Sequence, residues 1–272
     1  TYQEMEKALK KVQKAKGDRL AELRSILLGQ KPPRFREINT ELHIPALNPA
    51  QNQAVREILA AQDIAVVHGP PGTGKTTTLV HAIQQLCETE RSVLVTAPSN
   101  TAVDVLTERL AEQGLNVVRI GNISRVDESI IRHTIDARLS EHPESRNIKK
   151  VQLEAAEARR KAKRYRRKFG RKEWHERRQL MKEANELSAW AKQLEDRLID
   201  TILMQAQVVT CTLVGSMHSF IEHQQYRTVV IDEAAQALEP ASWIPITKAS
   251  KVILAGDPFQ LPPTIKSKEA RK

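Results

Sequence analysis

The chain has 272 residues, of which 40 % are hydrophobic, so it can form one large domain or a domain with an insertion, and it does not have a disordered composition. Lysine and arginine total 43 against 33 aspartate and glutamate, and the formal net charge of +10 favours an anionic partner such as nucleic acid. Uninterrupted apolar runs reach only about four residues, whereas a transmembrane helix needs roughly 20, so we expect no membrane partner.

The two cysteines, Cys87 and Cys211, exclude a disulfide framework and a zinc site. They fit a reducing intracellular compartment, which is the cytoplasm or, in a eukaryote, the nucleus.

Residues 1–30 are predicted to form a stalk helix. Apolar residues recur in this segment at spacings of three and four, which is the period of an amphipathic helix. Gly17 weakens the middle of the helix, and Gly29 with the prolines that follow ends it. Residues 31–47 contain three prolines and are predicted to be a linker.

Residues 48–123 and 208–265 are predicted to form one α/β core, followed by a tail over 266–272. Short β-branched runs there are apolar nearly throughout, as expected for strands buried on both faces. Helical stretches separate most of these runs, which indicates a parallel sheet built from βαβ units. The predicted strands are Ile64–Val67, Val93–Thr96, Val117–Ile120, Val208–Thr212, Val229–Ile231 and Val252–Ala255.

Residues 124–207 interrupt the core with a predicted basic helical insertion. Apolar positions spaced three and four apart run through residues 148–169 and again through 180–198, with Gly170 between them. This heptad pattern predicts an antiparallel helical hairpin. Residues 149–183 hold 15 basic and 5 acidic residues, so this window alone carries a surplus equal to that of the whole chain.

The basic surface of the hairpin suits the phosphate backbone of a nucleic acid, although a charged helix face can also be solvated without a partner. Tyr165 and Phe169 fall on the heptad seam and are expected in the core, Trp190 is expected to pack, and the role of Trp174 stays open. The residues expected to contact nucleic acid are Arg164, Arg166, Arg167 and Lys168.

The strongest motif matches G-x-x-x-x-G-K-[ST], the phosphate-binding loop, and it lies between a predicted strand and a predicted helix. Its glycines let backbone N–H groups turn toward a phosphate, and the helix N-terminus adds partial positive charge. Lys75 is predicted to reach the β- and γ-phosphates, and Thr76 to bind Mg²⁺. A glycine-rich turn without a ligand is the alternative. The predicted nucleotide-binding residues of this loop are Gly69, Pro70, Pro71, Gly72, Thr73, Gly74, Lys75, Thr76 and Thr77.

Two further strand ends carry side chains suited to phosphate chemistry. One strand ends in Asp232, predicted to hold Mg²⁺, and Glu233, predicted to take a proton from the attacking water. A helix with acidic residues in its first turn would give the same pattern. The last strand precedes Gln260, whose amide could donate to a γ-phosphate and orient water, with a proline-rich exit loop as the alternative.

Five segments resemble successive motifs of superfamily 1 helicases, in particular of the Upf-like branch, superfamily 1B. The segments are Leu47–Gln51, Ala97–Asp104, Val208–Thr212, Asp232–Gln236 and Gly256–Pro263. The resemblance implies a RecA-like P-loop NTPase fold, ATP and Mg²⁺ as cofactors, and ATP-driven 5′-to-3′ movement on single-stranded RNA or DNA.

The resemblance also implies roles for single residues. Gln51 would read the adenine edge, and Lys75, Glu233 and Gln260 would be catalytic, with Gln260 sensing the γ-phosphate. The nucleic-acid backbone would be contacted by Ser99, Asn100, Thr101 and Thr212.

Nine residues follow Pro263, which is too few for the second RecA-like domain that supplies arginines to the γ-phosphate in this family. We therefore expect the first motor domain of a larger helicase, weakly active alone. A P-loop kinase or NTPase not coupled to nucleic acid, and a non-enzymatic basic module that binds nucleic acid, are the alternatives.

Overall fold

The computed structural model describes residues 2–37, 42–70, 72–123, 128–164 and 170–260. It divides into two compact units, one formed by residues 1–134 with 206–272 and the other by residues 135–205. Within the described ranges, no helix combines the length and the apolar character needed to cross a bilayer.

A six-stranded sheet forms the centre of the first unit, with strand order β1-β6-β5-β2-β4-β3 and parallel pairing throughout. The strands are β1 (Ile64–His68), β2 (Val93–Ala97), β3 (Val117–Arg119), β4 (Val208–Thr212), β5 (Tyr226–Ile231) and β6 (Ala249–Gly256). All six predicted strands are present, and the predicted parallel α/β sheet is confirmed. Strands β5 and β6 begin earlier than predicted, because Thr228 and Lys251 are buried in the sheet although they are polar.

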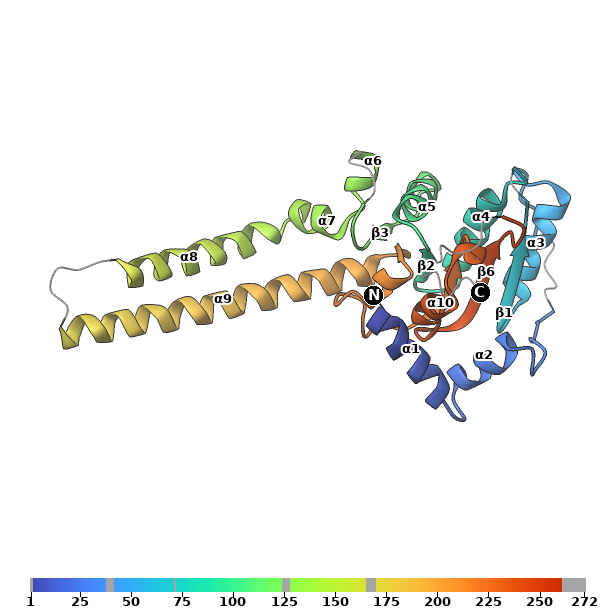
Figure 1. Ribbon diagram of the computed structural model, residues 1–272. Helices are drawn as coiled ribbons and strands as arrows, with labels where there is room; N and C mark the ends of the chain where they lie inside the picture. Colours follow the sequence, from blue (N-terminus) through green and yellow to red (C-terminus); the bar gives the residue numbers. More distant parts are fainter. Residues whose placement is uncertain (1, 38–41, 71, 124–127, 165–169, 261–272) are drawn as a thin grey trace. The chain divides into compact units, whose positions relative to one another are not determined.

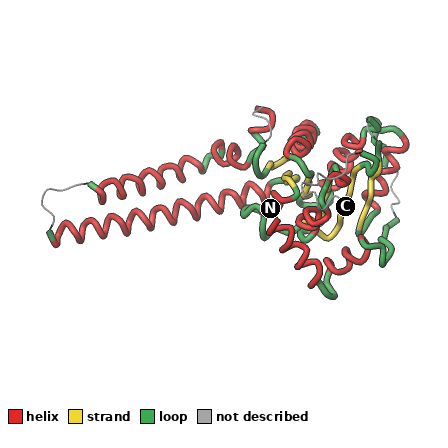
Figure 2. The backbone as a smooth tube through the Cα atoms, viewed as in Figure 1, coloured by secondary structure: helices red, strands yellow, loops and turns green. Residues whose placement is uncertain are grey.

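Helices cover both faces of this sheet (Figure 2). On one face, α3 (Pro49–Ala60), α4 (Lys75–Cys87) and α5 (Asn100–Glu112) share an apolar cluster with the strands, in which Ile58, Ile83 and Leu110 are 1 % exposed or less. On the other face, α10 (Glu239–Ile246) contacts β5 and β6, and it also contacts the 3₁₀ helix η1 (Val214–Met217). The short elements α6 (Glu128–Ile131) and η2 (Ala234–Gln236) also belong to this unit.

The stalk consists of two helices, α1 (Tyr2–Lys14) and α2 (Arg19–Leu27), so the prediction of one stalk helix is wrong. Gly17 adopts a φ of +69°, in the left-handed region that glycine adopts without strain. Asp18 then caps α2 by accepting a hydrogen bond from the Ala21 N–H at 2.8 Å. A break followed at once by a good N-cap residue starts a new helix rather than weakening an existing one.

The second unit contains α7 (Ile135–Glu141), α8 (Ser145–Lys163) and the long helix α9 (Arg171–Gln205), and α8 and α9 lie side by side (Figure 1). The described seam residues of α8, such as Val151, are buried, whereas the seam of α9 alternates between buried residues such as Ala191 and half-buried leucines such as Leu187. Trp190 is 50 % exposed, so the prediction that it packs is wrong. It adjoins the seam residue Ala191, and one step along a helix turns a side chain by about 100°. Tyr165 and Phe169 lie outside the described residues.

An ion network ties the stalk to the start of β1. Asp63 is fully buried and accepts hydrogen bonds from Arg19 Nη2 at 2.6 Å and from Arg34 Nη2 at 2.8 Å. Glu22 in α2 pairs with the same two arginines. The Arg34 side chain, followed by the Arg34 backbone N–H and Arg19, holds the pKa of the Asp63 carboxyl well below its usual range against the effect of burial.

Replacing Asp63 with Asn should lower the free energy of unfolding at pH 7 by about 2 kcal/mol, because a neutral amide loses charge-assisted hydrogen bonds to two guanidinium groups. The folded pKa lies below the unfolded value, so the carboxylate stabilises the fold above an unfolded pKa of about 4, and this stabilisation is lost as the pH falls further.

Urea unfolding at pH 7 and pH 3 measures both effects. Glu22→Gln is the control, since this part-exposed member of the same network should cost less. A loss on Asp63→Asn that stays as large at pH 3 as at pH 7 would contradict the expectation.

Candidate nucleotide-binding site

The carboxyl ends of β1, β6 and β5 lie side by side, and each carries one of the predicted motifs. The phosphate-binding loop follows β1, the Gln260 turn follows β6, and Asp232 and Glu233 follow β5. Strand β6 pairs with both of the others, at His68↔Gly256 and Ile231↔Leu254. Ligands of open α/β sheets bind at this edge, so three motifs that are far apart in sequence form one candidate site.

The phosphate-binding loop has the backbone that its glycines permit. Gly72 and Gly74 adopt φ values of +79° and +77°, and Gly74 is the N-cap of α4. A Cβ atom on Gly69 would lie 2.8 Å from Thr73 Oγ1, so a larger residue there would displace the Thr73 hydroxyl, which donates to the Pro70 carbonyl at 2.8 Å. The loop therefore turns its backbone toward the N-terminus of α4, where an anion is favoured.

A pocket of about 560 Å³ opens at the loop and is lined by loop residues including Lys75, together with Gln51 and His68. Thr76 is half-buried in the first turn of α4, whereas Thr77 is exposed and the pocket is lined instead by Thr78. Pro71 lies outside the described residues.

Gln51 reaches the loop from α3. Its Nε2 donates to the Thr73 carbonyl at 3.0 Å, while its Oε1 accepts the Asn48 N–H at 3.0 Å in a capping box. A Cβ atom on Gly74 would lie 2.5 Å from Gln51 Nε2, so the two residues are closely packed. The structure thus brings Gln51 to the loop, and its contact with adenine stays a prediction.

Asp232 is buried, with 4 % exposure, and its Oδ1 accepts the Glu233 N–H at 2.9 Å. Burial raises the pKa of the Asp232 carboxyl, while this hydrogen bond and the Lys75 ammonium act in the opposite direction. Lys75, at the start of α4, and Asp232, just after β5, therefore face the same site.

Mg²⁺ fits the donors that this site offers. A carboxylate and the Thr76 hydroxyl are hard oxygen ligands, and Mg²⁺ in such sites takes its other ligands from water and phosphate. In the described part of the chain, no three His, Cys, Asp or Glu side chains gather as a metal cluster. A metal held here would thus depend on substrate oxygens.

Glu233 has a φ of +55°. Among the described residues, no other residue except glycine has a positive φ. Backbone held in this region concentrates at functional sites. Its Oε2 accepts a hydrogen bond from Gln236 Nε2. The turn packs closely on β6, since a Cβ atom on Gly256 would lie 3.0 Å from the Ala235 nitrogen. The sequence analysis gave Gln236 no role of its own, although the residue closes the Asp232–Gln236 motif three residues after Glu233.

Gln260 is held by Asp257, whose Oδ2 accepts from Gln260 Nε2 at 3.2 Å. Asp257 Oδ1 accepts the Phe259 N–H at 3.0 Å and lies 3.3 Å from His68 Nε2. The Phe259 N–H chiefly lowers the pKa of this carboxyl. Asp257 and His68 therefore connect the Gln260 turn to the phosphate-binding loop. Sequence reasoning gave neither residue a role, although His68 directly follows the predicted strand Ile64–Val67 and Asp257 lies within the Gly256–Pro263 motif.

Four of the residues predicted to contact nucleic acid lie at the same edge of the sheet, near the carboxyl ends of β2 and β4. Ala97 and Thr212 end these strands and are paired in register, and Ser99 follows Ala97 by two residues. Ser99 Oγ accepts the Ala102 N–H as the N-cap of α5, and Thr212 Oγ1 accepts the Gly215 N–H at 3.0 Å. Their hydroxyls thus already hold the local backbone, and the nucleic-acid contacts stay predictions.

Asn100 is fixed by Arg119, a fully buried arginine in β3 that the sequence analysis did not single out. Arg119 Nη2 donates to Asn100 Oδ1 at 2.9 Å, and its Nε donates to Asp104 Oδ1 at 2.9 Å. Thr101, beside them, is exposed. A charged residue inside an apolar strand has no periodic signal, because its burial depends on distant partners.

The basic residues of the hairpin belong to the second unit. Arg164 is exposed at the end of α8, and Arg166, Arg167 and Lys168 lie outside the described residues. Trp174 is 47 % exposed, and the Arg178 guanidinium lies 5.4 Å from its ring centroid.

A phosphate-binding loop, a buried carboxylate two strands away and a parallel sheet between helices define a RecA-like P-loop nucleotide-binding domain. The chain belongs to the AAA domain family, which matches residues 46–268, and its relatives indicate the first motor domain of superfamily 1B.

Three relatives illustrate this kinship. The chain is 36 % identical to DNA-binding protein SMUBP-2 of Mesocricetus auratus, over 99 % of the chain and 27 % of that protein. It is 39 % identical to DNA polymerase alpha-associated DNA helicase A of Schizosaccharomyces pombe, over 82 % of the chain and 33 % of that protein. It is 35 % identical to ATP-dependent helicase upf1 of the same yeast, over 84 % of the chain and 23 % of that protein. The chain thus spans about a quarter to a third of their length.

Replacing Asp232 with Asn should raise the free energy of unfolding at pH 7, because burial disfavours a charged carboxylate and the amide carries no charge. The folded pKa lies above the unfolded value, so the unmodified chain loses stability as the pH rises from about 4 through the folded pKa, and the variant does not.

Thermal unfolding without nucleotide, at pH 7 and at pH 3.5 to 4, tests whether Asp232→Asn is more stable than the unmodified chain at pH 7 and whether this difference disappears in acid. Asp104→Asn is the matched control, since Asp104 pairs with the buried Arg119 and its loss should destabilise the fold. A less stable Asp232→Asn protein at pH 7 would refute the expectation.

Proposed function

We propose that this chain is the first motor domain of an ATP-dependent helicase or translocase that moves 5′-to-3′ on single-stranded RNA or DNA. The observation that carries the proposal is the convergence of Lys75, Gln260 and the buried Asp232 at the carboxyl ends of three adjoining strands. Two of the relatives above are named helicases and the third is named a DNA-binding protein, which supports the same activity.

In this proposal the loop N–H groups and the Lys75 ammonium bind the β- and γ-phosphates of ATP. Thr76 and Asp232 would hold Mg²⁺, which neutralises charge on those phosphates when bound. Gln51 would meet the edge of the adenine, and its hydrogen bond to the Thr73 carbonyl of the loop supports this role.

Glu233 is the proposed general base, which takes a proton from the water that attacks the γ-phosphorus. Gln236 is the positioning residue that holds one oxygen of this carboxylate. Gln260, held by Asp257, donates to the γ-phosphate and so registers whether it is present. The contact between Asp257 and His68 links that response to the phosphate-binding loop.

Coupling to movement follows from the shared edge. Thr212 ends β4, and Ser99 and Asn100 begin the helix that follows β2, next to the strand β5 that Asp232 follows. A second RecA-like domain would add the other half of the track and an arginine, worth a factor of about 10³ or more in rate in related enzymes. The 272-residue chain alone should then bind ATP–Mg²⁺ weakly, hydrolyse it slowly and not unwind a duplex.

Both cysteines are free, and we place the activity in the cytoplasm or, in a eukaryote, the nucleus.

Two variants should distinguish nucleotide binding from nucleotide hydrolysis. Lys75→Ala should weaken binding of a fluorescent ATP analogue with Mg²⁺ by at least about tenfold, because it removes a charge-assisted bond to phosphate. Glu233→Gln should bind the analogue normally and lose about 100-fold in hydrolysis, because the amide cannot accept the proton. Lys14→Ala, which removes an exposed lysine of α1 far from the loop in sequence, is the control.

Turnover with and without single-stranded nucleic acid then distinguishes the alternatives. Stimulation by the strand supports the motor, and turnover indifferent to the strand indicates an uncoupled NTPase. Strand binding unaffected by ATP and by Lys75→Ala indicates a basic binding module. Normal hydrolysis by Glu233→Gln would refute the assigned base.

The hairpin should add salt-sensitive affinity for a single strand. Changing Arg164, Arg166, Arg167 and Lys168 together to Ala should weaken binding at low salt and flatten the plot of log affinity against log salt by up to about 3, at about 0.7 for each phosphate that is no longer neutralised.

Fluorescence anisotropy with a labelled oligonucleotide at several salt concentrations measures this slope. The control removes the same charge from α1 and the turn after it, by Lys7→Ala, Lys10→Ala, Lys14→Ala and Lys16→Ala. Unchanged affinity of the hairpin variant at low salt would reject the proposed role of these residues.

A further inference from the structure

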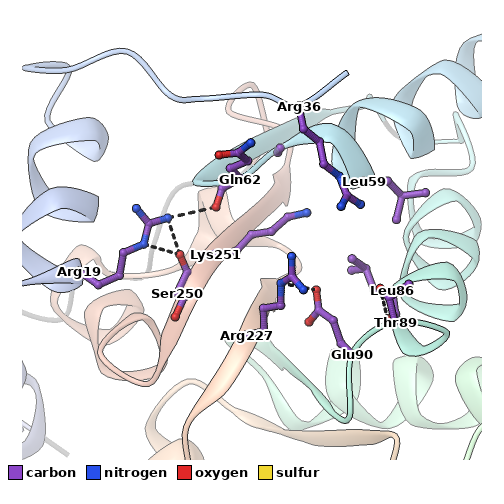
Figure 3. Close-up of a pocket in the computed structure, with 11 residues that line it drawn as sticks. Arg19, Arg36, Leu59, Gln62, Leu86, Thr89, Glu90, Arg227, Ser250 and Lys251 are labelled. Atoms are coloured by element: carbon purple, nitrogen blue, oxygen red, sulfur yellow. Dashed lines mark hydrogen bonds and ion pairs between the residues drawn. The ribbon is translucent and has the colours of Figure 1, made fainter. Parts of the chain in front are cut away.

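A second pocket lies at the amino ends of the strands, at the opposite edge of the sheet from the candidate nucleotide site. Its volume is about 300 Å³, at the lower end of the range for small-molecule sites. Arg36, Arg227 and Lys251 point into it, and Glu90 lies at its wall beside Arg227 (Figure 3). Arg227 and Lys251 come from β5 and β6, Glu90 from the turn after α4, and Arg36 from the segment that follows the stalk.

Few acceptors or anionic groups of the protein pair with these three cationic side chains. Lys251 Nζ donates to the Ile58 carbonyl at 2.6 Å, and Arg227 Nε lies 3.7 Å from Glu90 Oε1. No residue in the described ranges forms a hydrogen bond or ion pair with the Arg36 guanidinium. Arg19 also lines the pocket, but its guanidinium is already used by Asp63, Glu22 and backbone carbonyls. Arg36, Arg227 and Lys251 therefore share the Glu90 carboxylate.

This arrangement is electrostatically unfavourable until an anion enters. Lys251 is 5 % exposed, and burial lowers its pKa to about 8, an effect that Arg36 and Arg227 increase and Glu90 opposes. Lys251 is the buried member, whereas Arg36 and Arg227 are exposed to solvent, so the repulsion acts chiefly on the Lys251 ammonium. An anion between the three groups converts this repulsion into attraction. The charge of the pocket thus selects an anionic ligand.

Glu90 restricts which anion fits. It is 6 % exposed, its Oε1 accepts from Thr228 Oγ1 at 2.8 Å, and its Oε2 has no hydrogen-bond partner in the described part of the chain. A carboxylate repels an anion that has only acceptors, but it accepts a hydrogen bond from an anion that keeps a proton. Inorganic phosphate and a singly protonated phosphomonoester keep a P–OH group near neutral pH, whereas sulfate and the phosphodiesters of nucleic acid do not.

We propose that this pocket binds a phosphate group that carries a proton, as inorganic phosphate or a phosphomonoester. Arg36, Arg227 and Lys251 bind its oxygens, and Glu90 accepts its P–OH. The site is separate from the ATP site in the proposed function, and neither depends on the other.

Calorimetric titration of the 272-residue chain with inorganic phosphate at pH 6.5 tests the site. The double variant Arg36→Ala/Arg227→Ala should lose at least about tenfold in affinity, since each charge-assisted bond contributes about a factor of ten. Lys75→Ala should retain this binding, which separates it from phosphate held by the nucleotide loop. Lys14→Ala/Lys16→Ala removes the same charge from exposed positions and should change nothing. Circular dichroism melts check that each variant is folded.

Selectivity tests the role of Glu90. The unmodified chain should bind phosphate more tightly than sulfate, and Glu90→Gln should reverse or abolish that preference, because an amide can donate to sulfate. Tighter binding of glycerol phosphate than of inorganic phosphate identifies the ester as the ligand, and the reverse identifies the free ion; either result supports the site. Phosphate binding that is lost in Lys75→Ala but kept in the double variant, no binding by the unmodified chain, or equal affinity for phosphate and sulfate would overturn the proposal.

Discussion

The parallel pairing of β6 with both β1 and β5 is the constraint on which the candidate site depends. It brings the end of the loop strand beside Gly256 and the end of β5 beside Leu254, so the loop, the Gln260 turn and Asp232 reach one edge. The absence of a side chain at Gly256 then lets the Asp232–Gln236 segment approach β6 closely. A bulkier residue at that point would meet the backbone nitrogens of Ala234 and Ala235 and push this segment away from β6.

Charged groups gather at both ends of the strands, and the two ends differ in how these groups are paired. At the carboxyl ends, Lys75 faces Asp232, and the backbone of the loop supplies further partial positive charge. At the amino ends, buried polar groups such as Lys251 and Glu90 lie among apolar strands and satisfy each other only in part. The same sheet therefore offers two polar edges separated by an apolar layer.

The sheet was predictable because strands buried on both faces are apolar along their whole length, and a run such as Val93–Thr96 has this pattern without reference to any other segment. The loop and the strand-end carboxylates were predictable because their function requires a fixed local spacing. What sequence reasoning missed depends on distant partners. Lys251 extends β6 because its ammonium reaches the Ile58 carbonyl, Arg119 is buried because Asn100 and Asp104 receive it, and His68 meets Asp257 only through strand pairing.

The stalk break shows a local failure of a different kind. A periodic pattern continues across Gly17, but backbone conformation and the Asp18 cap decide where a helix stops, and neither alters the spacing of apolar residues. Periodicity thus describes which face of a helix is buried better than it describes where the helix ends.

The anchoring of the stalk at Asp63 has a mechanical consequence. Asp63 directly precedes β1, and the phosphate-binding loop directly follows it, so one strand of five residues, about 17 Å long, joins the two. A strand bonded along its length to β6 has little freedom to stretch or bend. Tension applied to α2 is therefore delivered along β1 to the backbone of Gly69, with no compliant segment to absorb it.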